Sequence, residues 1–127
     1  MAHKIREVYI VHHSHTDVGY TDLQEQVIYN QANNIRRAVE LIADGLEKGT
    51  NQKGLKWNCE TWYCVEQFLK VATKEEKKTF FDLVKKNSIG LSANYLNFND
   101  LADCEYLISR LDIDPDIINH TPNVKFW

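Results

Sequence analysis

A short apolar run followed at once by three histidines and an aspartate sets the start of this fold: Val8-Tyr9-Ile10-Val11-His12-His13-Ser14-His15-Thr16-Asp17-Val18-Gly19-Tyr20. The apolar run predicts a buried strand over about residues 7–13. Successive side chains of a strand point to opposite faces, so His13, His15 and Asp17 are expected to share one face. Gly19 then allows a sharp turn, because glycine takes positive φ without penalty.

The pair His15 and Asp17 is a candidate for metal binding. On an extended backbone the two residues lie about 7 Å apart, and both side chains can reach one ion. An imidazole nitrogen and a carboxylate oxygen together suit zinc, at bond lengths of roughly 2.0 to 2.2 Å. The simpler alternative is that these residues are surface polar groups or a cap. Three histidines and an aspartate within six residues favour the metal site.

A long helical region follows the histidine-rich stretch. Thr21–Gln24 fits a capping box, in which a threonine hydroxyl and a glutamine three residues later satisfy free backbone N–H groups. The region continues to Gly49, either as one helix or as two separated at the Asn-rich residues 30–34. Apolar residues spaced about three and four apart predict one buried face: Leu23, Val27, Ile28, Ile35, Val39, Ile42 and Leu46.

Strands and helices continue to alternate along the rest of the chain. The expected order is a strand over Leu55–Cys59, helices over Trp62–Val71 and Lys74–Lys86, a strand over Ile89–Leu96 and a helix over Leu101–Leu111. A second capping box, Thr73–Glu76, opens the third of these elements, whose apolar stripe is Phe80, Phe81 and Val84. Such alternation predicts an α/β fold with parallel strands and right-handed crossovers. The polar residues that follow each strand should then meet on one rim, and Glu60 is one of them. A plain helix N-terminal residue is the simpler interpretation of Glu60.

Composition and charge limit the classes of partner and the compartment expected for this chain. The 127 residues fit one domain, and a formal charge of −3 provides no basic field for nucleic acid or for an anionic membrane. Cys59, Cys64 and Cys104 contain no C-x-x-C pair, so reduced thiols in a cytoplasmic protein are expected. We interpret Cys59 and Cys64 as small core residues. No apolar run approaches the length of a membrane span.

The stretch Val11–Thr21 resembles the N-terminal signature of the glycoside hydrolase family 38 α-mannosidases. That signature is a His-Ser-His-x-Asp-x-Gly-aromatic run at the end of the first strand of a (β/α)7 barrel. The resemblance implies a zinc-dependent retaining hydrolase that acts on α-mannosides. It implies that His15 and Asp17 are zinc ligands and that His13 supports them from beside the ion. Tyr20 takes the place of an aromatic residue, usually tryptophan, that stacks on the sugar.

The nucleophile is where this chain departs from the family pattern. The family uses an Asp, also a zinc ligand, a few residues after a Gly-Gly-Trp motif. Aligning Tyr95 with that aromatic residue places Asn99 at the Asp position and Asp100 one residue beyond. Asparagine cannot form the glycosyl ester. A shift that makes Asp100 the nucleophile, a nucleophile elsewhere, and a chain that is no competent mannosidase all remain open, and Asp100 also fits a helix N-cap.

The resemblance further implies that residues 1–127 are the N-terminal part of a longer catalytic domain. The family's fourth zinc ligand and its acid/base carboxylate come later in the chain, so this part alone is expected to be inactive. Its exposed sheet edges would favour self-association. Two other functions stay open. A metal-dependent deacetylase or phosphoesterase also places His and Asp ligands at strand ends, and a non-catalytic interaction module would turn over nothing.

Overall fold

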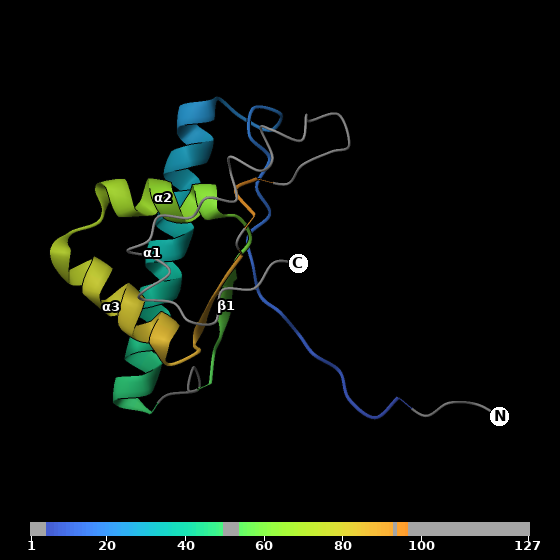
Figure 1. Ribbon diagram of the computed structural model, residues 1–127, viewed down its shortest axis with the longest axis vertical. Helices are drawn as coiled ribbons and strands as arrows, with labels where there is room; N and C mark the ends of the chain where they lie inside the picture. The colour runs from blue at the N-terminus through green and yellow to red at the C-terminus, as the bar shows by residue number, and fades with distance from the viewer. Residues whose placement is uncertain (1–4, 50–53, 93, 97–127) are drawn as a thin grey trace.

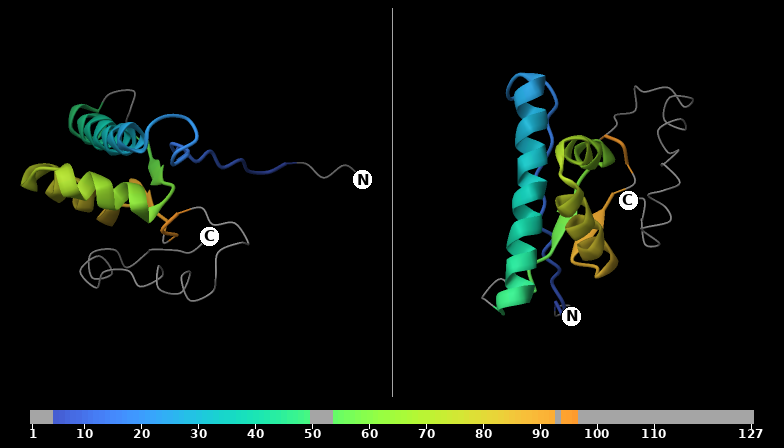
Figure 2. Two further views of the ribbon diagram at one scale, coloured as in Figure 1. Left: turned by 90° about the horizontal axis from the view of Figure 1, so that it is seen from above. Right: turned by 90° about the vertical axis from the view of Figure 1, so that its left-hand side faces the viewer.

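The computed structural model describes residues 5–49, 54–92 and 94–96. The elements within them are α1 (Gln24–Lys48), β1 (Trp57–Cys59), α2 (Trp62–Val71), α3 (Lys74–Lys85) and β2 (Ile89–Leu91). β1 and β2 pair in parallel, with Trp57 opposite Ile89 and Cys59 opposite Leu91. The three helices lie on the same side of this strand pair, and α1 packs against both α2 and α3 (Figure 1, Figure 2).

The β1-α2-α3-β2 unit follows the sequence prediction closely. The parallel pairing is confirmed, and α2 has the predicted limits. The capping box of α3 is confirmed as well: Thr73 accepts a hydrogen bond from the Glu76 N–H, and the Thr73 N–H donates to the Glu76 carboxylate at 2.6 Å. The buried residues of α3 are Phe80, as predicted, and Leu83. The other two residues of the predicted stripe, Phe81 and Val84, are half-buried.

The helical region before β1 is one continuous helix, α1. Asn30–Asn34 does not interrupt it, because the polar side chains bond to neighbouring side chains and to the preceding loop. The capping box predicted at Thr21–Gln24 is wrong. The helix begins at Gln24 without a side-chain cap, and the Leu23 N–H bonds instead to Asp22 Oδ1 at 2.8 Å.

The buried face of α1 is close to the predicted one. Val27, Ile35, Val39 and Ile42 are buried, whereas Ile28 is half-buried and Leu23 and Leu46 are exposed. At the other end, Gly49 adopts a left-handed conformation with φ 62° and donates its N–H to Gly45 O. Glycine is favoured there because a Cβ would be strained at that φ.

The strand predicted over residues 7–13 is wrong. Residues 5–17 adopt no regular secondary structure, and Val8, Tyr9, Ile10 and Val11 are exposed. The segment meets the sheet where Asn58 N–H donates to His12 O at 2.8 Å, and then it runs away from the helices toward the N-terminus (Figure 1). A strand needs a ladder of such bonds, so one contact with β1 does not make residues 7–11 part of the sheet.

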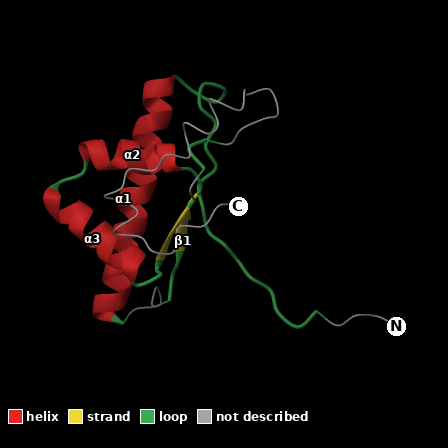
Figure 3. Cartoon of the chain, in the orientation of Figure 1, coloured by secondary structure: helices red, strands yellow, loops and turns green. Residues whose placement is uncertain are grey.

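The helices lie beside the strand pair (Figure 3), and buried side chains of both form the core. Apolar side chains from all five elements form it: Ile35, Val39, Ile42, Cys59, Val65, Phe68, Phe80, Leu83, Ile89 and Leu91. The rings of Phe68 and Phe80 pack with their centroids 5.3 Å apart and hold α2 against α3. Burial raises the pKa of the Cys59 thiol, which keeps it protonated and agrees with its predicted role in the core.

Several predicted features lie outside the described residues. These are the helix Leu101–Leu111, Cys104 and the stretch Asn97–Asp100. The strand predicted over Ile89–Leu96 is observed as Ile89–Leu91, and Ser92 N–H extends the pairing by donating to Cys59 O at 3.2 Å. Among the helices described, each is too short or too polar to cross a membrane.

The two threonines of the predicted capping boxes provide a test of this fold. Replacing Thr73 with alanine removes a formed cap and should lower the free energy of unfolding by about 1 kcal/mol. Thr21→Ala is the matched control and should change it by less than about 0.3 kcal/mol, because α1 begins without a side-chain cap. Urea unfolding of both variants measures the difference. Equal losses would contradict the helix start at Gln24.

Candidate functional site

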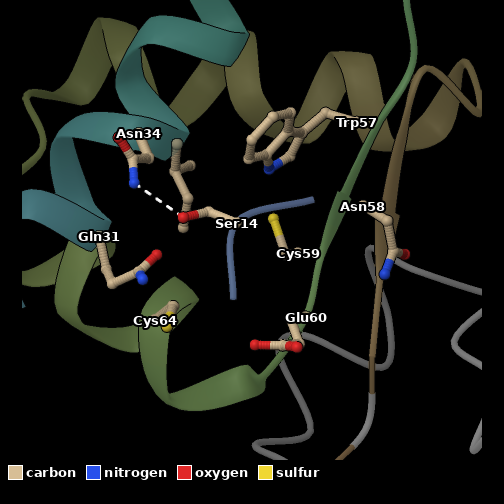
Figure 4. A pocket seen from close by; sticks show the side chains of 9 residues that line it. Ser14, Gln31, Asn34, Trp57, Asn58, Cys59, Glu60 and Cys64 are labelled. Atoms are coloured by element: carbon tan, nitrogen blue, oxygen red, sulfur yellow. Dashed lines mark hydrogen bonds between the residues drawn. The ribbon is translucent and has the colours of Figure 1, made fainter. Parts of the chain in front are cut away.

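The loop of residues 14–17 carries the predicted ligands, and α1 holds it from one side. Gln31 Nε2 donates to His15 O at 2.8 Å, and Asn34 Nδ2 donates to Ser14 Oγ at 2.9 Å. Figure 4 shows Gln31 and Asn34 reaching from α1 toward the loop, across a small cavity that Glu60 also lines. Gln31 thus holds the backbone, and Asn34 a side chain, of a segment that has no secondary structure of its own.

The start of α2 holds the same loop from the other side. Thr16 is buried, and its Oγ1 lies 3.1 Å from Cys64 Sγ, a hydrogen bond in which either atom can donate. Thr61, also buried, donates to the same sulfur at 3.2 Å. Side-chain hydrogen bonds of this kind satisfy polar groups that would be costly to bury alone. The sulfur of Cys64 thus links the loop to the N-terminus of α2.

Glu60, the residue directly after β1, makes the central contact with the loop. Its Oε1 accepts a hydrogen bond from His15 Nδ1 at 2.8 Å, and its Oε2 accepts one from the Thr16 N–H at 2.8 Å. His13 Nδ1 lies 3.6 Å from Oε1. The Glu60 side chain is only 15% exposed. One carboxylate thus fixes both a side chain and a backbone group of the loop.

The other nitrogen of His15 faces Asp17. Nε2 lies 3.2 Å from Asp17 Oδ1, and both side chains are largely open to solvent. Two ligand atoms on one tetrahedral zinc, each roughly 2.0 to 2.2 Å from the ion, lie about 3.3 to 3.6 Å apart. The observed separation is therefore close to one edge of a zinc coordination tetrahedron. Imidazole nitrogen and carboxylate oxygen are also suitable donor types for zinc, so the pair fits this metal.

The charges of the two carboxylates act on the histidine between them. The hydrogen bond to Glu60, followed by the charges of Glu60 and Asp17, raises the pKa of His15 above its ordinary value. Burial of Glu60 acts to raise its pKa. The hydrogen bonds from His15 and Thr16 outweigh that effect, and the pKa of Glu60 falls below its ordinary value. The site therefore favours a charged carboxylate beside a protonated imidazole.

The structure brings together three of the five site residues predicted from the sequence. His13 and His15 both approach Glu60, and Asp17 approaches His15. The turn predicted at Gly19 is present, with φ 92°. Tyr20 follows that turn and is 94% exposed. Asp100, the predicted nucleophile, lies outside the described residues.

Sequence reasoning missed how the site is supported. It weighed Glu60 as a carboxylate on the rim of the sheet and favoured a simple helix N-terminal residue. The available signal was that Glu60 directly follows one strand, just as the histidines directly follow the apolar run. Gln31 was overlooked because it interrupts an apolar stripe, yet a buried amide on such a face needs a polar partner. Asn34 belongs to the Asn-rich patch at which the sequence left one helix or two open.

A search of the described ranges for three or more His, Cys, Asp or Glu side chains arranged to hold one ion finds no such group. In comparisons with protein-family models, with curated proteins and with solved structures, nothing matches the chain. The geometry of the described residues is therefore the basis for the function proposed below.

The pairing of His15 with Glu60 should make stability depend on pH. A raised histidine pKa stabilises the fold fully below 6.5 and loses this effect as the pH rises through the folded-state pKa. A lowered glutamate pKa stabilises above 4.5 and loses it as the pH falls through the folded-state pKa. The stability lost in Glu60→Gln should therefore be largest between pH 4.5 and 6.5.

Urea unfolding of the wild type and Glu60→Gln at pH values from 3 to 9 measures this difference. Glu40→Gln is the matched control, because Glu40 pairs with Arg37 on the exposed face of α1, away from the loop. The control should give no maximum in this window. A difference between the wild type and Glu60→Gln that stays constant over the whole range would contradict the pairing.

Proposed function

We propose that this chain provides two zinc ligands, His15 and Asp17, of a zinc-dependent retaining α-mannosidase similar to glycoside hydrolase family 38. The observation that carries the proposal is the arrangement around His15: Nε2 lies 3.2 Å from Asp17 Oδ1, while Nδ1 is bonded to Glu60. Zinc-binding histidines commonly bond their second ring nitrogen to a carboxylate in this way. The sequence signature around these residues is the reason to favour α-mannosides over other substrates.

The overall arrangement supports the same proposal. In a doubly wound sheet the helices cover both faces, whereas in a barrel they form one outer layer. Here α1, α2 and α3 lie on one side of the parallel strand pair, which favours the first part of a (β/α)7 barrel (Figure 2). Glu60 and the loop of residues 14–17 meet at the carboxyl end of β1, where barrel enzymes place their active sites.

The cytoplasm is the proposed compartment of the protein. Cys59 and Cys64 are free and buried, which is compatible with the reducing conditions there.

Each residue of the proposed site has a separate task. His15 and Asp17 would hold the metal, and Glu60 and His13 would support His15 from behind. Bound zinc would supply a template for two sugar hydroxyls and would stabilise negative charge. Tyr20, with its exposed ring, is available to stack on a sugar face.

The nucleophile of the proposed reaction is Asp100. Its carboxylate would attack the anomeric carbon and form a glycosyl ester. A second carboxyl group would first protonate the leaving oxygen and then activate water. The retaining pathway requires the two groups about 5 to 5.5 Å apart. The neighbouring Asn99 cannot take the nucleophile's place, because an amide forms no glycosyl ester.

Two measurements test this function. The 127-residue chain should bind zinc in calorimetry, and binding should be lost in His15→Ala and in Asp17→Ala. His12→Ala is the matched control, because His12 is exposed and bonds to Asn58 through its backbone oxygen. This control should leave zinc binding unchanged, since its side chain takes no part in the proposed site.

The second measurement is hydrolysis of a panel of aryl glycosides by the protein expressed from its native reading frame. Only the α-mannoside should be cleaved, and a strong chelator, Asp17→Ala and Asp100→Asn should each abolish the activity. Folded protein that binds zinc and cleaves no glycoside would contradict the mannosidase and favour the deacetylase or non-catalytic alternative. Folded protein that binds no zinc would contradict the metal site itself.

A further inference from the structure

We propose that Glu60 is a positioning residue of the metal site: it keeps a proton on His15 Nδ1, so that the lone pair of Nε2 points to the ion shared with Asp17. The inference rests on the proposed zinc site and adds to it the device that orients the first ligand.

The two carboxylates around His15 differ in their exposure and in their hydrogen bonds. Both oxygens of Glu60 are engaged, one by His15 Nδ1 and the other by the Thr16 N–H, each at 2.8 Å. Its side chain is 15% exposed, whereas the side chain of Asp17 is 46% exposed and faces Nε2. Asp17 is therefore placed to bind an ion, and Glu60 is placed to hold the imidazole.

Glu60 is itself fixed in place. It follows β1 directly, at the point where Ser92 N–H donates to Cys59 O and closes the strand pairing. The bond from the Thr16 N–H fixes the second oxygen and thereby the plane of the carboxylate. A carboxylate held at both oxygens restricts the direction from which the imidazole can approach. The His15 backbone is fixed independently by Gln31.

The position of the proton on the His15 imidazole decides which ring nitrogen is free for a metal. Only a neutral imidazole binds a metal, and its single proton must then be on the nitrogen that does not touch the ion. In the metal-free protein His15 can donate from Nδ1 to Glu60 and, when protonated, from Nε2 to Asp17. Bound zinc would take the place of the Nε2 proton, which would go to solvent, and His15 would keep the Nδ1 proton in its hydrogen bond to Glu60. The accepted hydrogen bond also makes Nε2 a stronger donor to the metal.

The test uses the full chain with ¹⁵N-labelled histidine, without metal, at a pH at which His15 is neutral. Long-range ¹H–¹⁵N spectra should show the wild-type His15 with its proton on Nδ1. In Glu60→Gln and Glu60→Asp that preference should be lost. The amide offers one acceptor for two donors, and the aspartate is one methylene too short to reach both. Glu40→Gln is the matched control and should keep the wild-type spectrum.

Zinc affinity is measured on the same four proteins by competition with a chelating dye. Loss of the positioning carboxylate should weaken binding 10- to 100-fold, while Glu40→Gln leaves it unchanged. Circular dichroism verifies that each variant is folded. The tautomer and the zinc affinity of the better folded Glu60 variant are then compared with those of the wild type.

The outcomes separate this inference from the proposed function. An unchanged tautomer in the better folded Glu60 variant would overturn the inference, and so would an altered tautomer with unchanged zinc affinity. Wild-type protein that has the Nδ1–H tautomer but binds no zinc would overturn the proposed function, and with it the role of Glu60 in a metal site.

Discussion

The carboxylate of Glu60 is the contact on which the candidate site depends. Residues 14–17 have no regular secondary structure, and the Thr16 N–H and His15 Nδ1 are both satisfied by this one side chain. Removing a carboxylate from water is costly, and hydrogen bonds to a charged acceptor offset that cost better than neutral ones do. Glu60 makes these hydrogen bonds at the end of β1. The strand fixes the Glu60 backbone there, and the carboxylate therefore gives the loop a defined position.

The helical core places the remaining contacts of the loop. Gln31 and Asn34 reach it only because α1 continues unbroken through its Asn-rich part, and Cys64 reaches Thr16 only because α2 begins beside Glu60. The aromatic and aliphatic core keeps α1 against α2 and α3. Within the described residues every buried side-chain nitrogen and oxygen has a hydrogen-bond partner, so the loop is integrated into the fold although it is irregular.

Local signals in the sequence predicted the helices well and the N-terminal segment poorly. The α3 capping box lies within four residues, and α2 has a compact apolar face, so both could be located from the sequence. The run Val8–Val11 has the composition of a buried strand, but composition does not specify which edge it pairs with or what covers it. The contact of Glu60 with His15 joins residues 45 positions apart, and no periodicity encodes a pairing over that distance. Convergence of His13, His15 and Asp17 was nevertheless predictable, because alternate residues of any extended segment share a face.

The division of roles between the two carboxylates follows from their surroundings. An acidic residue that lies under the loop and accepts two hydrogen bonds is held in its ionised form, and it has little capacity left for a ligand. Asp17, on the exposed side of the same imidazole, can move by a few tenths of an ångström to admit an ion. Exchanging the two environments would give a loosely held histidine and a carboxylate unable to bind metal. One buried and one exposed acid around His15 is the arrangement that the proposed zinc site would need.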